Sequence, residues 1–190
     1  MTKNDLQAQK SETDTNHRTL AQKSYRTILK QEILAGLIEL KRPVSGLFLS
    51  SLSAGLDVGF SILLMACMLT LTTDVLPAPI VHIIVANMYS VGFILVILGR
   101  SELFTEHTTL AALPWFDGQA SLGEVGRVWG VVFVGNVIGA AFFAFVTWTI
   151  APALGVVEPW ALEEIAWNMV NHSWWVVLLS AVLAGWLMGE

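Results

Sequence analysis

Residues 99–114 read GRSELFTEHTTLAALP and interrupt a chain that is otherwise strongly apolar. The apolar run at 80–99 stops here, and the apolar stretch that follows is too short to cross a bilayer alone. This pattern favours a broken helix over a clean loop. An unpaired backbone amide in lipid costs several kcal/mol, so such a break is tolerated only where it is packed in protein or lines a water-filled cavity. The stretch therefore predicts a pore or a binding site.

The residues inside the break suggest what it would hold. Leu103 and Phe104 are bulky and apolar and could narrow a passage, while Thr105 offers a hydroxyl to a small polar solute. A half-helix that begins near Glu106 would point its positive N-terminal end into the same space, which favours an anion. The alternative is a cytosolic loop followed by a short re-entrant helix with no role in binding.

Further apolar runs on both sides of this stretch predict an all-α integral membrane protein. The run at 44–73 contains one charged residue, Asp57, and is long enough to cross a bilayer with some tilt. Another run spans 128–154, and residues 152–171 form an acidic connection without Lys or Arg. The last apolar run stops at Glu190, short of a full crossing, so the chain is expected to end inside a helix.

The N-terminal part of the chain divides into two predicted segments. Residues 1–23 are polar and aperiodic, which is typical of a disordered cytosolic tail. Residues 24–43 carry apolar side chains at helical spacing and predict an amphipathic helix, either on the membrane face, against a neighbouring subunit, or simply solvated. Residues 44–190 would then form the transmembrane domain, in incomplete form.

The distribution of positive charge predicts the orientation of a multi-pass protein in the cell (inner) membrane. Eight of the ten Lys and Arg residues precede the first span. The positive-inside rule therefore places the N-terminus in the cytoplasm and the segment 152–171 outside.

Composition excludes several classes of function. Hydrophobic residues make up 55% of the chain and charged residues 13%, too apolar for a soluble enzyme of this size. The net charge of -5 disfavours a nucleic-acid partner. The sequence contains no GxSxG, HExxH, P-loop or CxxC motif, so neither an enzyme nor a cofactor or metal is expected. Ser101, Glu106 and His107 could be arranged on paper as a hydrolytic triad, but nothing sets their geometry.

Two polar residues lie in the middle of predicted spans. A carboxylate at this depth costs on the order of 3 kcal/mol, so Asp57 is expected either to handle protons or gate a solute, or to pack with a hydroxyl such as Ser53 or Ser61. Asn136 could contact the solute, although an interhelical hydrogen bond is favoured. Together with the three residues of the break, these form the predicted pore or solute-binding set: Asp57, Leu103, Phe104, Thr105 and Asn136.

Three stretches resemble the formate/nitrite transporter family. Residues 101–106, SELFTE, are similar to the Leu-Phe-Thr loop of the family's second helix, and residues 133–139, FVGNVIG, to its aromatic-x-Gly-Asn-x-x-Gly stretch. A weaker match is SAGLDVG at 53–59. The resemblance implies an aquaporin-like inverted repeat of three plus three helices, a homopentamer with one pore per subunit, and passage of a small monovalent anion such as formate or nitrite.

The chain also departs from this family pattern. The family's fourth helix carries Asn-Trp-Leu-Val where this sequence reads GWLM at 185–188, and its second broken helix, with a pore histidine, would lie beyond Glu190. The chain is thus expected to supply the first repeat and part of the second. The alternative function is a non-transporting membrane subunit, or an incomplete copy with a structural or regulatory role.

Overall fold

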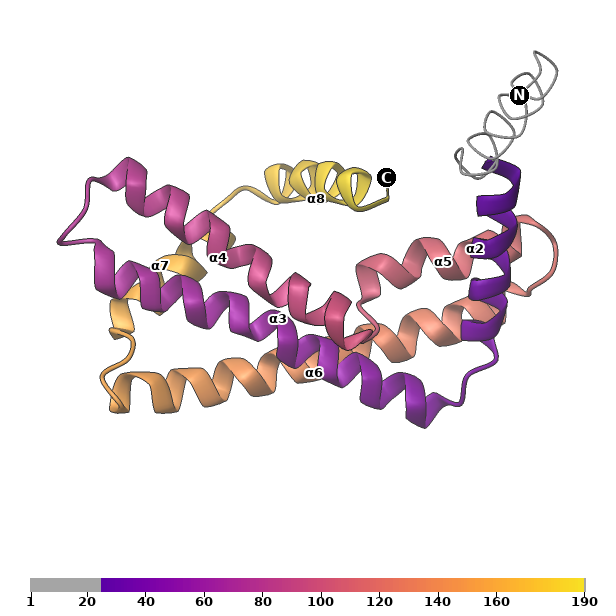
Figure 1. Ribbon diagram of the computed structural model, residues 1–190, viewed down its shortest axis with the longest axis horizontal. Coiled ribbons are helices and arrows are strands. Elements are labelled where there is room, and N and C mark those ends of the chain that lie inside the picture. The colour runs from indigo at the N-terminus through magenta and orange to yellow at the C-terminus, as the bar shows by residue number, and fades with distance from the viewer. Residues whose placement is uncertain (1–24, 190) are drawn as a thin grey trace, which may run out of the picture.

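The computed structural model describes residues 25–189, all of whose regular elements are helices (Figure 1). The predicted tail at 1–23 lies outside the described residues. The helices, in chain order, are α2 (Tyr25–Leu40), α3 (Val44–Thr72), α4 (Ala78–Gly99), α5 (Phe104–Phe116), α6 (Leu122–Ala153), α7 (Pro159–Val170) and α8 (Trp174–Gly189).

Three of the described helices are long and apolar enough to cross a membrane. These are α3, α4 and α6; the pair α7 and α8 makes a fourth candidate if the two helices, bent by 91° at their junction, count as one broken span. The long helices run side by side along the long axis of the molecule (Figure 1), and α3 lies between α4 and α6. Most of their surface faces outward, as expected for helices that contact lipid or other protein.

Glycines allow the close contact between α3 and α6. A side chain at Gly55 would meet the backbone carbonyl of Asn136, and one at Gly139 would meet the carbonyl of Leu52. The small-residue pairs of both helices therefore pack against each other, as their spacing suggests. The glycine pair on the first half of α6 differs, because no described residue outside α6's own backbone lies within 4 Å of a side chain placed at Gly126 or Gly130.

Two apolar clusters stabilise opposite ends of the bundle. One joins the end of α3 and the start of α4 to α6 and α7, with buried residues Ala66, Leu69, Val81, Ala151, Val157, Ala161 and Ile165. The other joins α2, the start of α3, α5 and the start of α6, with buried residues Leu40, Leu47, Ala111, Val125, Val128 and Val132. The connection between α4 and α5 therefore lies between these two apolar clusters.

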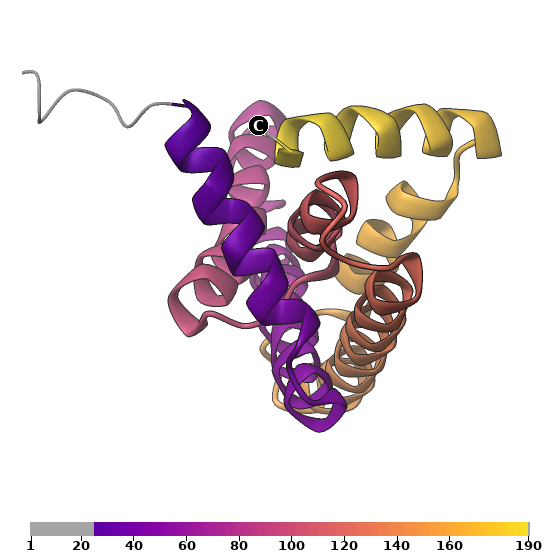
Figure 2. The ribbon, with the colours of Figure 1, turned by 90° about the vertical axis from the view of Figure 1, so that its right-hand side faces the viewer.

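A helix forms within the predicted segment 24–43: α2 covers Tyr25–Leu40, and it packs on its own chain. Ile33, Gly36 and Leu40 face inward, and Gly36 lets the helix approach the carbonyl of Leu110 and the ring of Pro114 on α5. Arg127 of α6 donates hydrogen bonds to the carbonyls of Leu40 and Arg42, which satisfies acceptors at the end of α2. Figure 2 shows α2 crossing beside the long helices.

Two element boundaries differ from the sequence-based expectation. The connection predicted at 152–171 contains a helix, α7, which begins with Pro159 in its first turn, where proline is well tolerated. The third span begins at Leu122 rather than Val128, because Ser121 and Glu124 form a capping box. In that box the Ser121 hydroxyl accepts from the backbone N–H of Glu124, and the Glu124 carboxylate accepts from the backbone N–H of Ser121.

Candidate functional site

The break predicted in residues 99–114 lies between α4 and α5. Helix α4 ends at Gly99, and Arg100 adopts a left-handed backbone conformation, with φ of 51° and ψ of 39°. A non-glycine residue rarely adopts this conformation, which turns the chain sharply. Helix α5 begins at Phe104, two residues earlier than the expected start near Glu106, and Leu103 is its N-cap residue. The break is therefore short, at 100–103.

Asn136 of α6 holds the break through three hydrogen bonds. Its Oδ1 accepts from the backbone N–H of Phe104 at 2.7 Å, and its Nδ2 donates to the carbonyls of Glu102 at 2.9 Å and Ser51 at 2.7 Å. One side chain thus joins α3, α6 and both sides of the break. The expected interhelical hydrogen bond of Asn136 is confirmed, and it satisfies backbone groups that the break leaves without helical partners.

Asp57 of α3 holds the same break from another direction. Its Oδ2 accepts a hydrogen bond from the hydroxyl of Ser101 at 3.1 Å. The expected hydroxyl partner is therefore present, but it is Ser101 rather than Ser53 or Ser61. Ser61 instead donates to the carbonyl of Tyr89 and accepts from the backbone N–H of Gly92, which joins α3 to α4.

Both of these polar residues lie near the middle of a candidate span. Asn136 is 14 residues from the start of α6 and 17 from its end, and Asp57 is 13 and 15 residues from the ends of α3. Side chains at the centres of two long apolar helices therefore contact one four-residue break. If α3 and α6 cross a bilayer, the break lies at membrane depth, where exposed backbone polar groups would be costly in lipid.

The residues that follow the break differ in exposure. Leu103 and Phe104 are partly buried, and the Phe104 ring meets the Phe133 ring edge to face, with centroids 5.3 Å apart. Thr105 and Glu106 are exposed. The N-terminus of α5 therefore presents a hydroxyl and a carboxylate, whereas the N–H of Phe104 is already bonded to Asn136.

A charged cluster lies beside the break, towards α2. Glu102 is buried, and its Oε1 pairs with Nη1 of Arg42, which also contacts Glu39 Oε2 at 3.1 Å. Burial alone would lower the pKa of Arg42, but the hydrogen bonds and charges of Glu102, and then of Glu39, raise it above its usual value. Glu102 therefore faces a permanent positive charge from Arg42.

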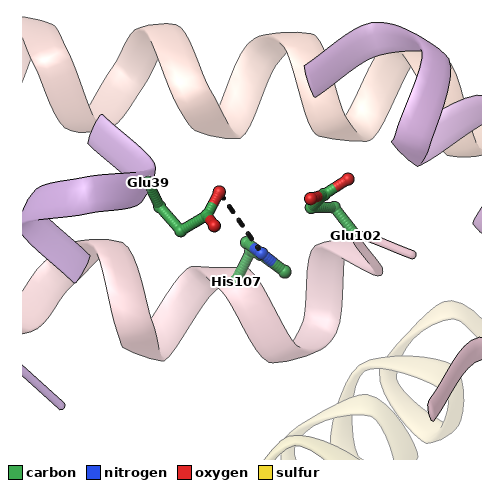
Figure 3. A group of neighbouring side chains, drawn as sticks. All are labelled: Glu39, Glu102 and His107. Carbon is green, nitrogen blue, oxygen red and sulfur yellow. Dashed lines mark ion pairs between the residues drawn. The ribbon is translucent and has the colours of Figure 1, made fainter. Parts of the chain in front are cut away.

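His107 joins this cluster from the first turns of α5. It is buried, and its Nε2 lies 3.9 Å from Glu39 Oε2 (Figure 3). No sequence pattern indicates this contact, because 68 residues separate His107 from Glu39. The role of Arg42 was missed because no spacing in the sequence indicates that α2 folds back onto the break. The partners Ser51 and Ser101 were missed because their contacts with Asn136 and Asp57 join residues far apart in the chain.

A comparison with protein-family models identifies the family. The model described as "Formate/nitrite transporter" matches residues 26–189, which is nearly the whole of the described chain. The chain belongs to the formate/nitrite transporter family. Members of this family are membrane channels and transporters rather than enzymes.

Curated relatives in the formate/nitrite transporter family are distant. The chain is 29% identical to inner membrane protein YfdC of Escherichia coli over 153 residues, which cover 79% of the chain and 48% of the relative. It is 28% identical to formate channel FocA of Haemophilus influenzae over 70% of the chain and 47% of the relative. It is 26% identical to nitrite transporter NirC of Salmonella typhimurium over 75% and 52%. The chain therefore spans about half the length of the curated relatives it matches.

The family assignment agrees with the observed fold in its coarse features. The chain is a multi-pass membrane protein whose described residues form helices only, with three to four candidate spans among them, as expected for part of a formate/nitrite transporter fold. All three family-like stretches meet at the break. The SELFTE stretch forms it, Asn136 of the FVGNVIG stretch bonds its backbone, and Asp57 of the SAGLDVG stretch accepts from Ser101.

Proposed function

We propose that the full-length protein conducts a small monovalent anion, such as formate or nitrite, through a passage lined by the break between α4 and α5. The observation that carries this proposal is the convergence of Asp57 and Asn136, each from the middle of a long apolar helix, on residues 101–104. A broken backbone held in this way by polar side chains is suited to line a water-filled cavity.

The two mid-span residues act in this proposal as positioning residues. Asn136 and Asp57 use their polar atoms on the backbone and on Ser101, so their main contribution is to fix the shape of the break. Leu103 and Phe104 would form the apolar constriction. A rigid constriction needs support, and the edge-to-face contact of Phe104 with Phe133 provides it.

Selectivity for an anion rests on the start of α5. The helix presents its positive N-terminal end near Thr105, whose exposed hydroxyl can donate to a solute oxygen. The pairing of Glu102 with Arg42 supports this role, because it neutralises the buried carboxylate closest to the passage. Glu106 remains exposed and weakens anion binding unless it points away from the passage.

The assembly and orientation belong to the same proposal. A homopentamer in the inner membrane, with its N-terminus in the cytoplasm, is consistent with the family, with the clustering of Lys and Arg before α3, and with the inner-membrane relative from Escherichia coli. Single cysteines at Lys10 and Glu163 test the orientation: an impermeant reagent added outside intact cells should label the second and not the first. The reverse pattern would contradict it.

Flux in proteoliposomes tests the function itself. The full-length protein should carry formate and nitrite down a gradient at a rate well above protein-free vesicles, while a neutral solute of similar size should pass slowly. Vesicles that contain correctly folded protein and show no anion flux would contradict the proposal and favour a non-transporting role.

A further inference from the structure

The cluster formed by Glu39, Glu102 and His107 has the composition of a metal site. Each residue offers one ligand atom, and these atoms lie within 4.8 Å of one another. The three side chains come from α2, from the break and from α5 (Figure 3), so they are brought together only by the fold. We propose that Glu39, Glu102 and His107 bind a divalent transition-metal cation such as Zn²⁺, which takes the place of the Arg42 guanidinium.

The first argument concerns the proton on His107. Its Nδ1 lies 3.3 Å from the carbonyl oxygen of Leu103, which can only accept a hydrogen bond, so Nδ1 carries the hydrogen. In the neutral ring, Nε2 then presents a lone pair towards Glu39 Oε2, 3.9 Å away. A lone pair facing a carboxylate is favourable only if a cation lies between them. A backbone carbonyl that orients an imidazole in this way is also the usual support of a metal-bound histidine.

The second argument concerns Glu102. Its side chain is only 4% exposed, and its Oε2 has no hydrogen-bond partner among residues 25–189. An unsatisfied buried carboxylate oxygen is costly, and a metal ion would satisfy it. The two carboxylates also outnumber the single guanidinium of Arg42, so the cluster with neutral His107 carries a net negative charge that a divalent cation would offset.

Geometry and access both permit binding. Ligands of a tetrahedral Zn²⁺ with bonds of about 2.1 Å lie about 3.4 Å apart, so the three side chains must close by about 1 Å or slightly more. Arg42 is 31% exposed and follows the last turn of α2, so it can turn outward and leave room for the ion. A mixed set of carboxylates and one imidazole suits Zn²⁺ and related ions, whereas Mg²⁺ rarely uses imidazole.

Equilibrium binding of Zn²⁺ to the purified full-length protein, measured against a chromophoric chelator, tests the proposal without reference to transport. We expect one tight site per chain, with Mg²⁺ unable to compete at the same concentration. His107→Gln and Glu102→Gln should each weaken binding by at least about tenfold, since loss of even an outer-shell partner costs about 10- to 100-fold in metal affinity. His172→Gln, which changes an exposed histidine, is the matched control and should have no effect.

The variant Arg42→Gln tests whether the Arg42 side chain competes with the metal ion for the site. It should bind Zn²⁺ at least as tightly as the unmodified protein, because the guanidinium no longer occupies the site. Unchanged binding in His107→Gln, weaker binding in Arg42→Gln, or equal displacement by Mg²⁺ would overturn the proposal. If a variant fails to fold, X-ray absorption of the unmodified protein with one equivalent of Zn²⁺ provides the test. An imidazole nitrogen among the zinc ligands is expected, and its absence would also overturn the proposal.

Failure of this site and failure of the anion pathway are distinguishable. Zn²⁺ binding is measured at equilibrium with no gradient, and the anion pathway is measured as flux in metal-free buffer. If no Zn²⁺ binds, Arg42 is left as the cation that faces Glu39 and Glu102, and the metal proposal is wrong.

Discussion

The side chain of Asn136 accepts a hydrogen bond from the backbone N–H of Phe104 at 2.7 Å, across 32 residues of sequence. This contact joins the centre of α6 to the first residue of α5, so the broken helix and the third span are fixed relative to each other. The same amide also bonds Ser51 and Glu102. Replacing this one residue should therefore disturb the whole break.

Asn136→Leu is expected to destabilise the protein. The substitution removes the partner of the Phe104 N–H and of the Glu102 carbonyl, and each buried group left unsatisfied costs about 1 to 3 kcal/mol. Asn87→Leu is the matched control, because the Asn87 amide donates to the carbonyl of Ile83 in its own helix and is exposed. Thermal unfolding in detergent should show a clear loss for Asn136→Leu and little for Asn87→Leu. Equal losses would contradict the assigned role.

Phe104→Ala should enlarge the constriction. It removes the ring that meets Phe133, so anion flux should rise or discrimination between formate and larger carboxylates should fall. The measurement is flux of a series of anions in proteoliposomes, with Phe142→Ala, a change on the exposed face of α6, as the control. Unchanged flux and selectivity in correctly folded Phe104→Ala protein would mean that the constriction lies elsewhere.

Thr105→Val and Glu106→Gln test the sign of the permeant charge. Losing a hydrogen bond to a charged solute costs about 1.5 to 3 kcal/mol, so Thr105→Val should weaken anion affinity about tenfold or more. Glu106→Gln removes a repelling charge and should leave affinity equal or improved. Transport should be measured against substrate concentration at two pH values. A silent Thr105→Val together with inactive Glu106→Gln would indicate a cation or proton pathway instead.

Gly139→Ala should destabilise the contact between α3 and α6. The added methyl group would meet the carbonyl of Leu52, and overpacking of this kind typically costs about 1 to 3 kcal/mol. Gly130→Ala, on the same helix, meets open space and is the control. The unfolding temperature should fall clearly for Gly139→Ala and little for Gly130→Ala. A similar fall in both variants would contradict the role of Gly139 in the contact between α3 and α6.

Much of this fold follows from sequence because its strongest signals are local. Long apolar runs predict α3, α4 and α6, and the polar residues between Gly99 and Phe104 predict the break, since each depends on neighbours in the chain. The Ser-x-x-Glu pattern at Ser121 and Glu124 is also a local signal for a capping box, and it predicts the observed start of α6 at Leu122. Helix α7 was harder to predict, because its two glutamates made the segment resemble an external loop.

The side-chain contacts of the candidate site could not be predicted from local sequence signals. Sequence indicated that Asp57 and Asn136 need polar partners, but not that Ser101 and the backbone of 102–104 supply them. The pair of Arg42 with Glu102 depends on α2 folding back onto α5, which follows from the small size of Gly36 and the position of Pro114. Long-range packing of this kind leaves no periodic signal in one sequence.

Accessibility of a cysteine at Thr105 tests the central claim most directly, namely that the start of α5 lines a water-filled anion passage. Cys67, the one cysteine in the sequence, is first replaced by alanine. Thr105→Cys in the full-length protein should then react with a small water-soluble thiol reagent, and formate or nitrite should slow the reaction while a neutral solute should not. Phe142→Cys should stay unreactive and Gln119→Cys reactive. No reaction at Thr105→Cys, or a rate that formate and nitrite leave unchanged, would contradict the account.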